Sequence, residues 1–495
     1  MAWLIPVLLF PVFGTLFYVF VQLQMETKIF AKRIAEVQKR TDHFLEQDTA
    51  VYERLSRRSR RNANLSLYMK KSGGYPTWDR TNFKYFPLGD EFYTDVLQEL
   101  QKARRYIFVE YFIISKGILW DSILKILEQK AKEGVEVRIL YDGMNSFSNL
   151  PHDYPKELEA KGIRCRIFNP IRPAISTSQN NRDHRKILVI DGHTAYTGGV
   201  NLADEYINRK VRFGHWKDNA IRLKGEAVRN FTVMFLQMWD VCSKKPDSDF
   251  DYSPYLDTGD YFHSPELDMD GFSIPFSDSP IDGEPVGHQL YLDIIYQAKK
   301  YVYIMTPYLV LDDDMITALT YAAKRGVDTV IIMPHIPDKK SAFMLAHSYY
   351  TELIEAGVKI YEYLPGFVHS KTFVSDGEKA VVGSVNMDFR SQYLNFECGV
   401  YIYENPVVEQ IKKDFDETLP KCVAADRTVD VGRMQEKNGL AGKHPDGMIQ
   451  KKKRKRAEEN LLYSLPSFSF SGSAAAVLTD DSARSRKEVA PISFL

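Results

Sequence analysis

Apolar positions in this chain of 495 residues follow the same alternating pattern twice. In each half, a strand-like apolar run is followed by a segment with a helical period and then by a second strand-like run. These segments span residues 106–113, 121–132 and 135–141 in the first half and residues 302–311, 314–324 and 327–333 in the second. The alternation predicts an α/β fold in which each half has a central mixed, largely parallel sheet flanked by helices.

Short segments of similar sequence indicate that the two halves are duplicated domains. Ala103-Arg-Arg-Tyr-Ile-Phe-Val109, for example, parallels Ala298-Lys-Lys-Tyr-Val-Tyr-Ile304. We expect the first domain at residues 76–243 and the second at residues 286–425, each close to the usual size of a domain. Residues 244–285 are rich in Asp, Ser, Pro and Gly, and we interpret them as a linker.

The first 25 residues contain no charged side chain and are long enough to cross about 30 Å of hydrocarbon. We therefore expect a transmembrane anchor at residues 1–25; a cleaved signal peptide is the alternative, but the basic n-region is lacking. Basic residues follow in residues 26–75, so the positive-inside rule places the catalytic part on the cytoplasmic side. A basic cluster in this membrane-proximal segment either contacts anionic head groups or is solvated; it comprises Arg54, Arg57, Arg58, Arg60 and Arg61.

Composition and charge limit the partners. Lys and Arg together number 65, as do Asp and Glu, so the formal net charge is zero and we expect no nucleic acid as a partner. Four scattered cysteines without a Cys-x-x-Cys pair signal neither a zinc site nor a disulfide framework. Residues 426–495 include the basic run Lys451–Arg456, and we expect a disordered basic tail there. The sequence gives no indication of the oligomeric state.

The candidate chemistry comes from the pattern His-x-Lys-x4-Asp-x6-Gly-(Gly/Ser)-x-Asn, which occurs twice, 185 residues apart. Six defined positions that repeat at identical spacing are unlikely to arise by chance. The first copy is His184, Lys186, Asp191, Gly198, Gly199 and Asn201, and the second is His369, Lys371, Asp376, Gly383, Ser384 and Asn386.

Each copy predicts a β-hairpin, because a β-rich run ends in Asp-Gly, a strong signal for a tight turn. Side chains alternate along a strand, so the histidine and the lysine of each copy share a face. Asp191 and Asp376 belong to the catalytic motif but enter the turn, and we interpret them as mainly structural. Small residues at the end of the returning strand let a ligand approach; the expected phosphate contacts are Gly199, Asn201, Ser384 and Asn386.

Two such sets suit a phosphodiester. The lysines and asparagines can neutralise charge that grows at phosphorus. One histidine can attack phosphorus as a neutral imidazole while the other protonates the leaving alkoxide, and an unperturbed pKa of about 6.5 suits both roles. The attacking imidazole needs an acceptor on its second nitrogen. Asp218 and Glu397, which follow His184 and His369 by 34 and 28 residues, are candidates to orient their histidines.

The chain resembles the phospholipase D superfamily and, within it, the bacterial-type cardiolipin synthases. The resemblance covers residues 80–420 and includes Asn181-Arg-Asp-His184-Arg-Lys186, Thr306-Pro-Tyr308, Gly366-Phe-Val-His369 and Asn386-Met-Asp-Phe-Arg-Ser391. It implies a cell-membrane enzyme without metal or cofactor that joins two phosphatidylglycerols into cardiolipin and releases glycerol. It also implies paired histidines as nucleophile and general acid, and we assign the nucleophile to His184 by this resemblance.

Four alternatives stay open at this stage. Water in place of a lipid hydroxyl would make the chain a phospholipase D-type hydrolase of lipid head groups. Another alcohol, such as phosphatidylethanolamine or glycerol, would change the acceptor. A phosphodiesterase or nuclease, and a noncatalytic lipid-binding scaffold, are the remaining two. Partners common to most of these readings are phosphatidylglycerol, other anionic phospholipids and the membrane.

Overall fold

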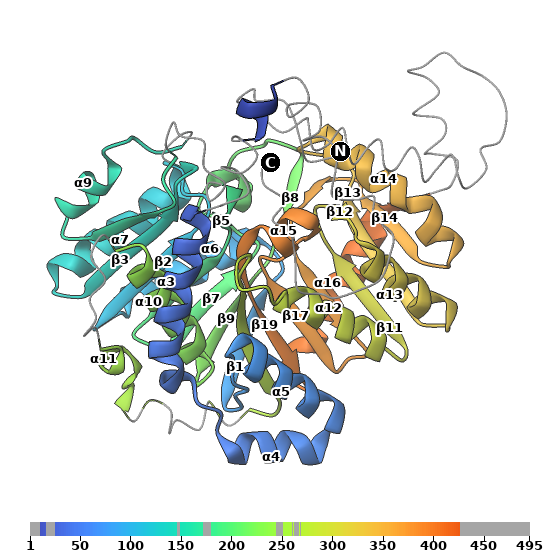
Figure 1. Cartoon of the computed structure of the whole chain (residues 1–495), viewed down its shortest axis with the longest axis horizontal. Helices are drawn as coiled ribbons and strands as arrows, with labels where there is room; N and C mark the ends of the chain where they lie inside the picture. The colour runs from blue at the N-terminus through green and yellow to red at the C-terminus, as the bar shows by residue number, and fades with distance from the viewer. Residues whose placement is uncertain are drawn as a thin grey trace.

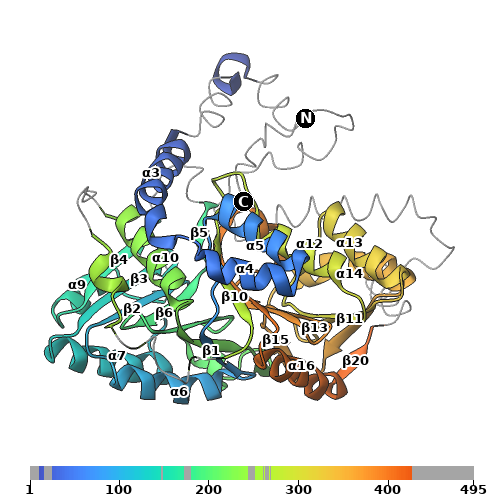
Figure 2. The ribbon, with the colours of Figure 1, turned by 90° about the horizontal axis from the view of Figure 1, so that it is seen from below.

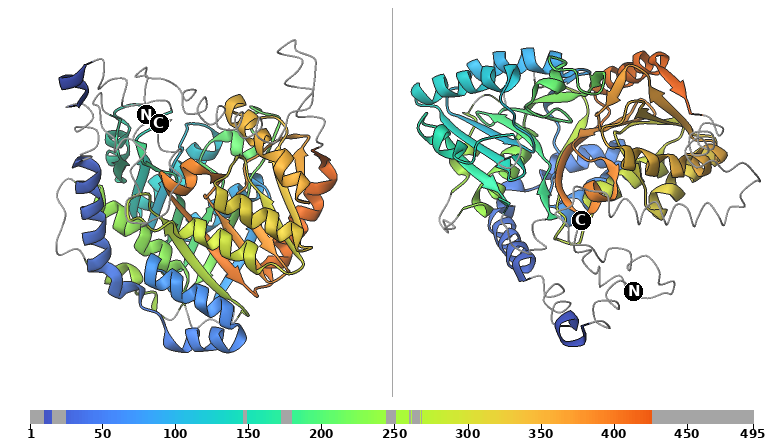
Figure 3. Two further views of the ribbon diagram at one scale, coloured as in Figure 1. Left: turned by 45° about the vertical axis from the view of Figure 1, so that its right-hand side comes forward. Right: turned by 90° about the horizontal axis from the view of Figure 1, so that it is seen from above.

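The computed structural model describes residues 10–15, 25–145, 149–171, 180–243, 251–259, 261, 267 and 269–425. Two mixed sheets lie side by side and are covered by helices on both faces (Figures 1 and 2). The helices α6, α7 and α16 cover one face, whereas α3, α5, α10, α12 and α13 cover the other (Figures 2 and 3). This is the α/β architecture with duplicated halves that the alternating pattern predicted.

The first half contains a seven-stranded sheet of order β1-β9-β7-β6-β2-β3-β4. Its strands are β1 (Thr81–Phe86), β2 (Tyr106–Tyr111), β3 (Glu136–Asp142), β4 (Arg164–Phe168), β6 (Lys186–Ile190), β7 (Thr194–Gly198) and β9 (Ala220–Gly225). Its helices are α6 (Gly89–Gln101), α7 (Ile118–Lys132), α9 (Tyr154–Glu159) and α10 (Val228–Val241), with the 3₁₀ helix η3 (Asp204–Ile207).

The second half repeats this arrangement in the order β10-β19-β17-β16-β11-β13-β14-β20. Its strands are β10 (Phe272–Asp278), β11 (Tyr301–Met305), β13 (Asp328–Pro334), β14 (Lys359–Tyr363), β16 (Thr372–Ser375), β17 (Lys379–Gly383), β19 (Asn395–Tyr403) and β20 (Cys422–Ala424). Its helices are α12 (Val286–Gln297), α13 (Asp313–Lys324), α14 (Lys340–Glu355), α15 (Phe389–Tyr393) and α16 (Val407–Thr418), with η6 (Leu419–Lys421).

The expectation of largely parallel sheets was wrong. Among the described strands, β2, β3 and β4 pair in parallel, as do β11, β13 and β14, because a helix returns the chain between them. The β6–β7 and β16–β17 hairpins then add antiparallel neighbours, and β9, β1, β19, β10 and β20 extend the sheets in the same antiparallel way. Each sheet is therefore predominantly antiparallel around a parallel βαβ unit.

The segment expected as a linker, residues 244–285, contributes a strand and a short helix. Its strand β10 forms one edge of the second sheet and pairs with β19, and α11 (Ser253–Leu256) packs near α10. Pro275 lies inside β10, and an edge strand tolerates a proline because its missing N–H removes no central ladder bond.

The two halves share a hydrophobic core. One buried apolar cluster includes Phe231 and Phe235 on α10, Phe276 on β10 and Phe396 on β19. Several shorter strands also join the halves or flank the site: β5 (Arg182–Asp183), β8 (His215–Lys217), β12 (Leu309–Val310), β15 (Gly366–Val368) and β18 (Met387–Asp388). The halves therefore form a single packed unit.

The N-terminal part consists of α3 (Met25–Thr41), η1 (Asp42–Leu45), α4 (Thr49–Arg58) and α5 (Arg60–Gly73). α3 lies along α10, where the Arg33 guanidinium donates to the Asp240 carbonyl at 3.0 Å. No helix among the described residues is both long and apolar enough to cross a bilayer. The span expected at residues 1–25 lies mostly outside the described residues, and the tail expected at residues 426–495 lies wholly outside them.

The basic cluster near residue 54 spans α4 and the start of α5. α4 lies at the edge of the molecule opposite the start of α3 (Figure 1). Its arginines pair with carboxylates: Arg54 Nε lies 2.9 Å from Asp79, Arg57 lies 3.1 Å from Glu53, and Arg58 pairs with Glu404. Arg54 and Arg58 thus link α4 to other segments, although exposed pairs of this kind contribute little to stability. Contact of the cluster with anionic head groups stays a prediction.

Candidate active site

Each motif histidine is held by a short strand that pairs with the other half of the chain. β5, just before His184, pairs in parallel with β19, and β15, just before His369, pairs in parallel with β8. The His184 N–H donates to the Phe396 carbonyl at 2.9 Å, and the His369 N–H donates to the Lys217 carbonyl at 2.7 Å. This crossed pairing brings the two hairpins to one site between the sheets.

The acidic partners are exchanged between the halves. His184 Nδ1 lies 2.9 Å from Glu397 Oε2, and His369 Nδ1 lies 2.7 Å from Asp218 Oδ2. The sequence offsets paired each carboxylate with the histidine of its own half, and this pairing was wrong. The reason is that β19, which contains Glu397, and β8, which Asp218 follows directly, each pair with the strand that precedes the opposite histidine.

Both motif lysines are almost fully buried beside their histidines. The Lys186 ammonium donates to the His184 carbonyl at 2.5 Å. The Lys371 ammonium donates to the His369 carbonyl and lies 2.8 Å from His369 Nδ1. The histidine and lysine of each copy therefore share a face, as the strand alternation predicted.

Burial and mutual repulsion shift the pKa values of these cations downward. Burial lowers the pKa of His184 to about 4 and that of His369 to about 3, and the attraction of Glu397 and Asp218 only partly opposes this. Burial also lowers the pKa of Lys186 to about 8 and that of Lys371 to about 7. The expected unperturbed histidine pKa of about 6.5 therefore does not apply, and both imidazoles are neutral at pH 7.

The pKa values of the two carboxylates are lowered as well, which for an acid favours the charged form. Burial opposes ionisation of Glu397 and Asp218, but the neighbouring histidine and lysine outweigh it and lower both pKa values. Charge effects also cross between the halves: Lys371 contributes to lowering the pKa of His184, and Lys186 contributes to lowering that of His369. The six groups therefore share one electrostatic site.

The small residues of the motifs serve the carboxylates. Ser384 Oγ donates to Glu397 Oε2 at 2.5 Å instead of presenting its hydroxyl to an open site. A Cβ atom on Gly199 would lie 2.0 Å from Asp218 Oδ1, so glycine is required there for the carboxylate to approach. The direct phosphate contact expected of these two residues stays a prediction.

The two asparagines differ in their surroundings. Asn201 Oδ1 accepts from the Ile113 N–H at 3.1 Å, and its amide donates to the Tyr206 hydroxyl at 2.8 Å. Asn386 donates its backbone N–H to Ser391, and its buried Oδ1 has no hydrogen-bond partner among the described residues. Asn386 thus has a polar group left for a ligand, whereas both ends of the Asn201 amide are engaged.

Asp191 and Asp376 lie away from the histidines, at the turn end of each hairpin. Asp191 has a positive φ and accepts from the backbone N–H groups of residues 104–106 at 2.8–2.9 Å. Asp376 accepts in the same way from residues 299–301 at 2.7–3.0 Å. Both therefore fasten the hairpin turn to the start of a parallel strand, which suits the mainly structural role expected for them; a catalytic role for either stays a prediction.

Sequence reasoning missed residues that support the site. Ser391 Oγ donates to Glu397 Oε1 at 2.5 Å, so three side chains besides His184 hold this carboxylate: Ser384, Ser391 and Asn395. On the other side, Lys217 pairs with Asp414 at 2.7 Å directly beside Asp218. Ser391 could have been predicted, because it ends the family motif Asn386-Met-Asp-Phe-Arg-Ser391. Nothing near Asp414 in the sequence points to the site.

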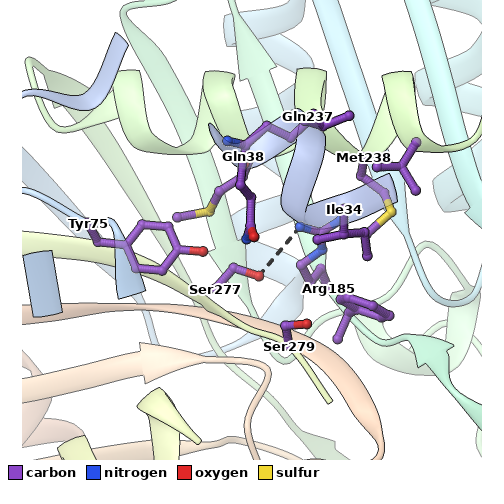
Figure 4. A pocket seen from close by; sticks show the side chains of 12 residues that line it. Ile34, Gln38, Tyr75, Arg185, Gln237, Met238, Ser277 and Ser279 are labelled. Carbon is purple, nitrogen blue, oxygen red and sulfur yellow. Dashed lines mark hydrogen bonds between the residues drawn. The ribbon is translucent and has the colours of Figure 1, made fainter. Parts of the chain in front are cut away.

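The middle residue of the first motif, Arg185, faces away from the histidine, as alternation requires. It is buried against Asp183 at 3.1 Å and forms an ion pair with Glu110. It also borders a small cavity of about 30 Å³ beneath α3, where its guanidinium lies 3.5 Å from Ser277 Oγ (Figure 4). No cluster of three His, Cys, Asp or Glu side chains in the described part of the chain is arranged to hold a metal ion.

Comparison with known proteins identifies relatives of this chain. Residues 96–239 and 291–419 match the family model described as "Cardiolipin synthase, PLD-like domain". The chain is 36% identical over 425 residues to the cardiolipin synthase of Alkalihalophilus pseudofirmus; the matched region covers 84% of this chain and 81% of the relative. It is also 36% identical over 419 residues to the cardiolipin synthase of Geobacillus kaustophilus, with the same coverage of both chains.

Two further comparisons extend the picture. An uncharacterized protein of Streptococcus mutans is 49% identical over 418 residues, covering 84% of this chain and 89% of its own. Among solved structures, the phosphatidylserine synthase of Haemophilus influenzae has a TM-score of 0.56 at 14% identity and covers 77% of this chain and 93% of its own. At this identity, the second comparison shows the fold alone.

Proposed function

Because the chain belongs to the cardiolipin synthase family of phospholipase D-like proteins, we propose that it is a membrane-bound phosphatidyltransferase that joins two phosphatidylglycerols into cardiolipin and glycerol. The observation that carries the proposal is the pair of buried histidines, each bonded through Nδ1 to a carboxylate of the other half. This contact leaves both Nε2 atoms for chemistry at one phosphorus.

In the first step, His184 Nε2 attacks the phosphorus of phosphatidylglycerol. An N–P bond forms while the P–O bond to the head-group glycerol breaks, and His369 Nε2 gives its proton to the departing alkoxide. Glu397 stabilises the positive charge that grows on His184, because it is an ionised, fully buried acceptor. The pKa of His184, lowered to about 4, keeps the attacking imidazole unprotonated.

In the second step, the neutral His369 takes a proton from the hydroxyl of a second phosphatidylglycerol, whose oxygen attacks phosphorus as the N–P bond breaks. Both histidines thereby return to their starting states. His369 must carry a proton when the first step begins, although burial lowers its pKa to about 3. The negative charge of the bound diester raises this pKa, and Lys186, Lys371 and the amide Nδ2 of Asn386 donate to the nonbridging oxygens.

Water in place of the second lipid would give phosphatidic acid, so hydrolysis is the rival outcome of the same site. The test is purified full-length protein with phosphatidylglycerol labelled in the head-group glycerol and in the acyl chains, in detergent or vesicles. Cardiolipin with free glycerol is the expected result, and His184→Ala should abolish it. Phosphatidic acid alone would establish a hydrolase, and cleavage of oligonucleotides without lipid turnover would establish a nuclease.

Localisation follows from the same proposal. We place the enzyme at the bacterial cell membrane, held by the apolar segment at residues 1–25, with its catalytic domains on the cytoplasmic side. A two-chain lipid does not leave the bilayer readily, so an enzyme that uses it as both donor and acceptor has to work at the membrane surface.

A further inference from the structure

The edge of the molecule that carries the catalytic residues also carries exposed apolar side chains on several loops. These loops follow β3, β4 and β13 or precede β8 and β15, and they continue into the first turns of α14. Val211 is 82% exposed and Met344 is 60% exposed. We call the set the rim; it consists of Met144, Ile171, Val211, Ile336, Met344 and Leu364.

In both halves, the rim lies at the same end of the sheet as the catalytic histidine. β6 begins opposite the carboxyl end of β2, and β16 begins opposite the carboxyl end of β11, so His184 and His369 sit at the carboxyl ends of the parallel strands. The loops after β3, β4 and β13 emerge at these same ends. Asp142, the last residue of β3, accepts the Asp183 N–H at 2.9 Å, which ties the loop of Met144 to the residue beside His184.

A short ribbon connects the rim to the catalytic residues. β8 and β15 run in parallel toward the site, and their outer ends are preceded by Val211 and Leu364. A Cβ atom on Gly214 would lie 2.4 Å from the Pro365 carbonyl and 3.2 Å from the Ile336 side chain, so the three rim segments lie side by side.

Aromatic rings continue along this ribbon down to the histidine. The ring centroids of Phe213 and Phe367 are 5.9 Å apart, those of Phe367 and Trp216 are 4.9 Å apart, and those of Trp216 and His369 are 5.5 Å apart. An apolar wall therefore runs from the exposed rim to the reacting group.

Exposed cations alternate with the apolar rim residues. Val211 lies between Lys210 and Arg212, which follow Arg209, and Ile336 is followed by Lys339 and Lys340. Scattered single apolar residues need no explanation, but a set combined with cations around one opening marks an interaction surface. Apolar groups interleaved with lysine and arginine fit the interface of an anionic bilayer.

The position of α3 is consistent with a rim that faces the membrane. α3 starts at the same edge as the catalytic loops, whereas α4 with its paired arginines lies at the opposite edge (Figure 1). The apolar segment before α3 therefore joins the described structure on the side of the rim.

We propose that the rim is an interfacial docking surface that seats the mouth of the active site on anionic phospholipid, so that phosphatidylglycerol head groups reach His369 without leaving the bilayer. The proposal rests on the proposed function, because it assumes a lipid substrate. The rim residues insert among the acyl chains near the head groups, and the neighbouring cations contact the lipid phosphates.

The test compares full-length protein reconstituted in phosphatidylglycerol vesicles with the same protein in mixed detergent micelles. The rim variant carries Val211→Glu and Met344→Glu. The matched control carries Tyr296→Glu and Tyr321→Glu, two exposed apolar positions at the far ends of α12 and α13, away from the mouth. We expect the rim variant to lose at least about tenfold of the vesicle rate while its micelle rate stays within about twofold of wild type, and the control to keep both rates.

An unchanged vesicle rate, or equal losses in vesicles and micelles, would overturn the proposal. A second measurement does not depend on activity: single Val211→Trp and Tyr321→Trp variants are placed in vesicles whose acyl chains are brominated. Quenching of the added tryptophan is expected at position 211 and not at position 321, and equal quenching would contradict a docking role for the rim. If wild type makes no cardiolipin in any medium, the proposed function fails, and the quenching result alone decides the rim.

Discussion

The exchange of carboxylates between the halves makes Glu397→Gln the sharpest test of the mechanism. Glu397 is fully buried, lies 2.9 Å from His184 Nδ1 and carries its charge in the resting site. A glutamine keeps the size and the contacts with Ser384 and Ser391 but removes the negative charge. The first step then builds a positive charge on His184 without its buried counter-charge.

The magnitude follows from the contact that is lost. A hydrogen bond to a charged group contributes about 1.5–3 kcal/mol, and each 1.4 kcal/mol off a barrier is about tenfold in rate. We therefore expect kcat to fall by about 10- to 150-fold. The KM for phosphatidylglycerol should change little, because Glu397 does not bind the substrate phosphate.

The assay is the initial rate of cardiolipin formation from labelled phosphatidylglycerol in mixed micelles, together with the thermal midpoint of each variant. Glu362→Gln is the matched control, because Glu362 is also a buried glutamate bonded to histidines, at 2.8 Å from His335 and 3.0 Å from His347, but it lies outside the catalytic set. If Glu397→Gln retains kcat within threefold, or if both variants lose rate in step with stability, the orienting role of Glu397 is refuted.

Three further outcomes are expected. The first uses a phosphatidyl substrate whose leaving group, nitrophenol, needs no general acid. His369→Ala should release a burst of nitrophenol and retain a phosphohistidine, whereas His184→Ala should give neither. A burst from His184→Ala would reverse the assignment of the nucleophile. Because the pKa of Lys371 is about 7 in the free site, kcat/KM should fall as pH rises above 7 while the ammonium loses its charge, and a pH profile of kcat/KM that stays flat to pH 9 would contradict a phosphate contact for Lys371. Asp191→Ala removes an acceptor of three backbone N–H groups and should lower the unfolding free energy by about 2–3 kcal/mol in a denaturant titration, with kcat per folded molecule within twofold; a selective loss of kcat would place Asp191 in the catalytic set.

The local structure around the motifs was predictable because its causes are local. Asp-Gly after a β-rich run gives the hairpins at β6–β7 and β16–β17, and alternation places each lysine beside its histidine. The strand–helix–strand units at β2, α7 and β3 followed from periodicity in the same way. These elements needed no information from distant parts of the chain.

The features that depend on distant contacts were not predictable. The pairing of β5 with β19 joins residues more than 200 positions apart, and it determines which carboxylate meets which histidine. A short offset along the sequence favoured the wrong partners for Asp218 and Glu397. The low histidine pKa values likewise result from burial between the halves, and burial of this kind leaves no mark in the local sequence.

Each catalytic histidine depends on a carboxylate of the other half, and this limits how such a protein can be divided or can have evolved. Neither half alone contains a histidine together with the carboxylate that supports it. A fragment ending near residue 250 would contain His184 without Glu397, and Asp218 without His369. An ancestor of half this length could pair each histidine with a carboxylate only as a symmetric dimer. After fusion, a loss in one half cannot be compensated within that half, so both repeats stay under common selection.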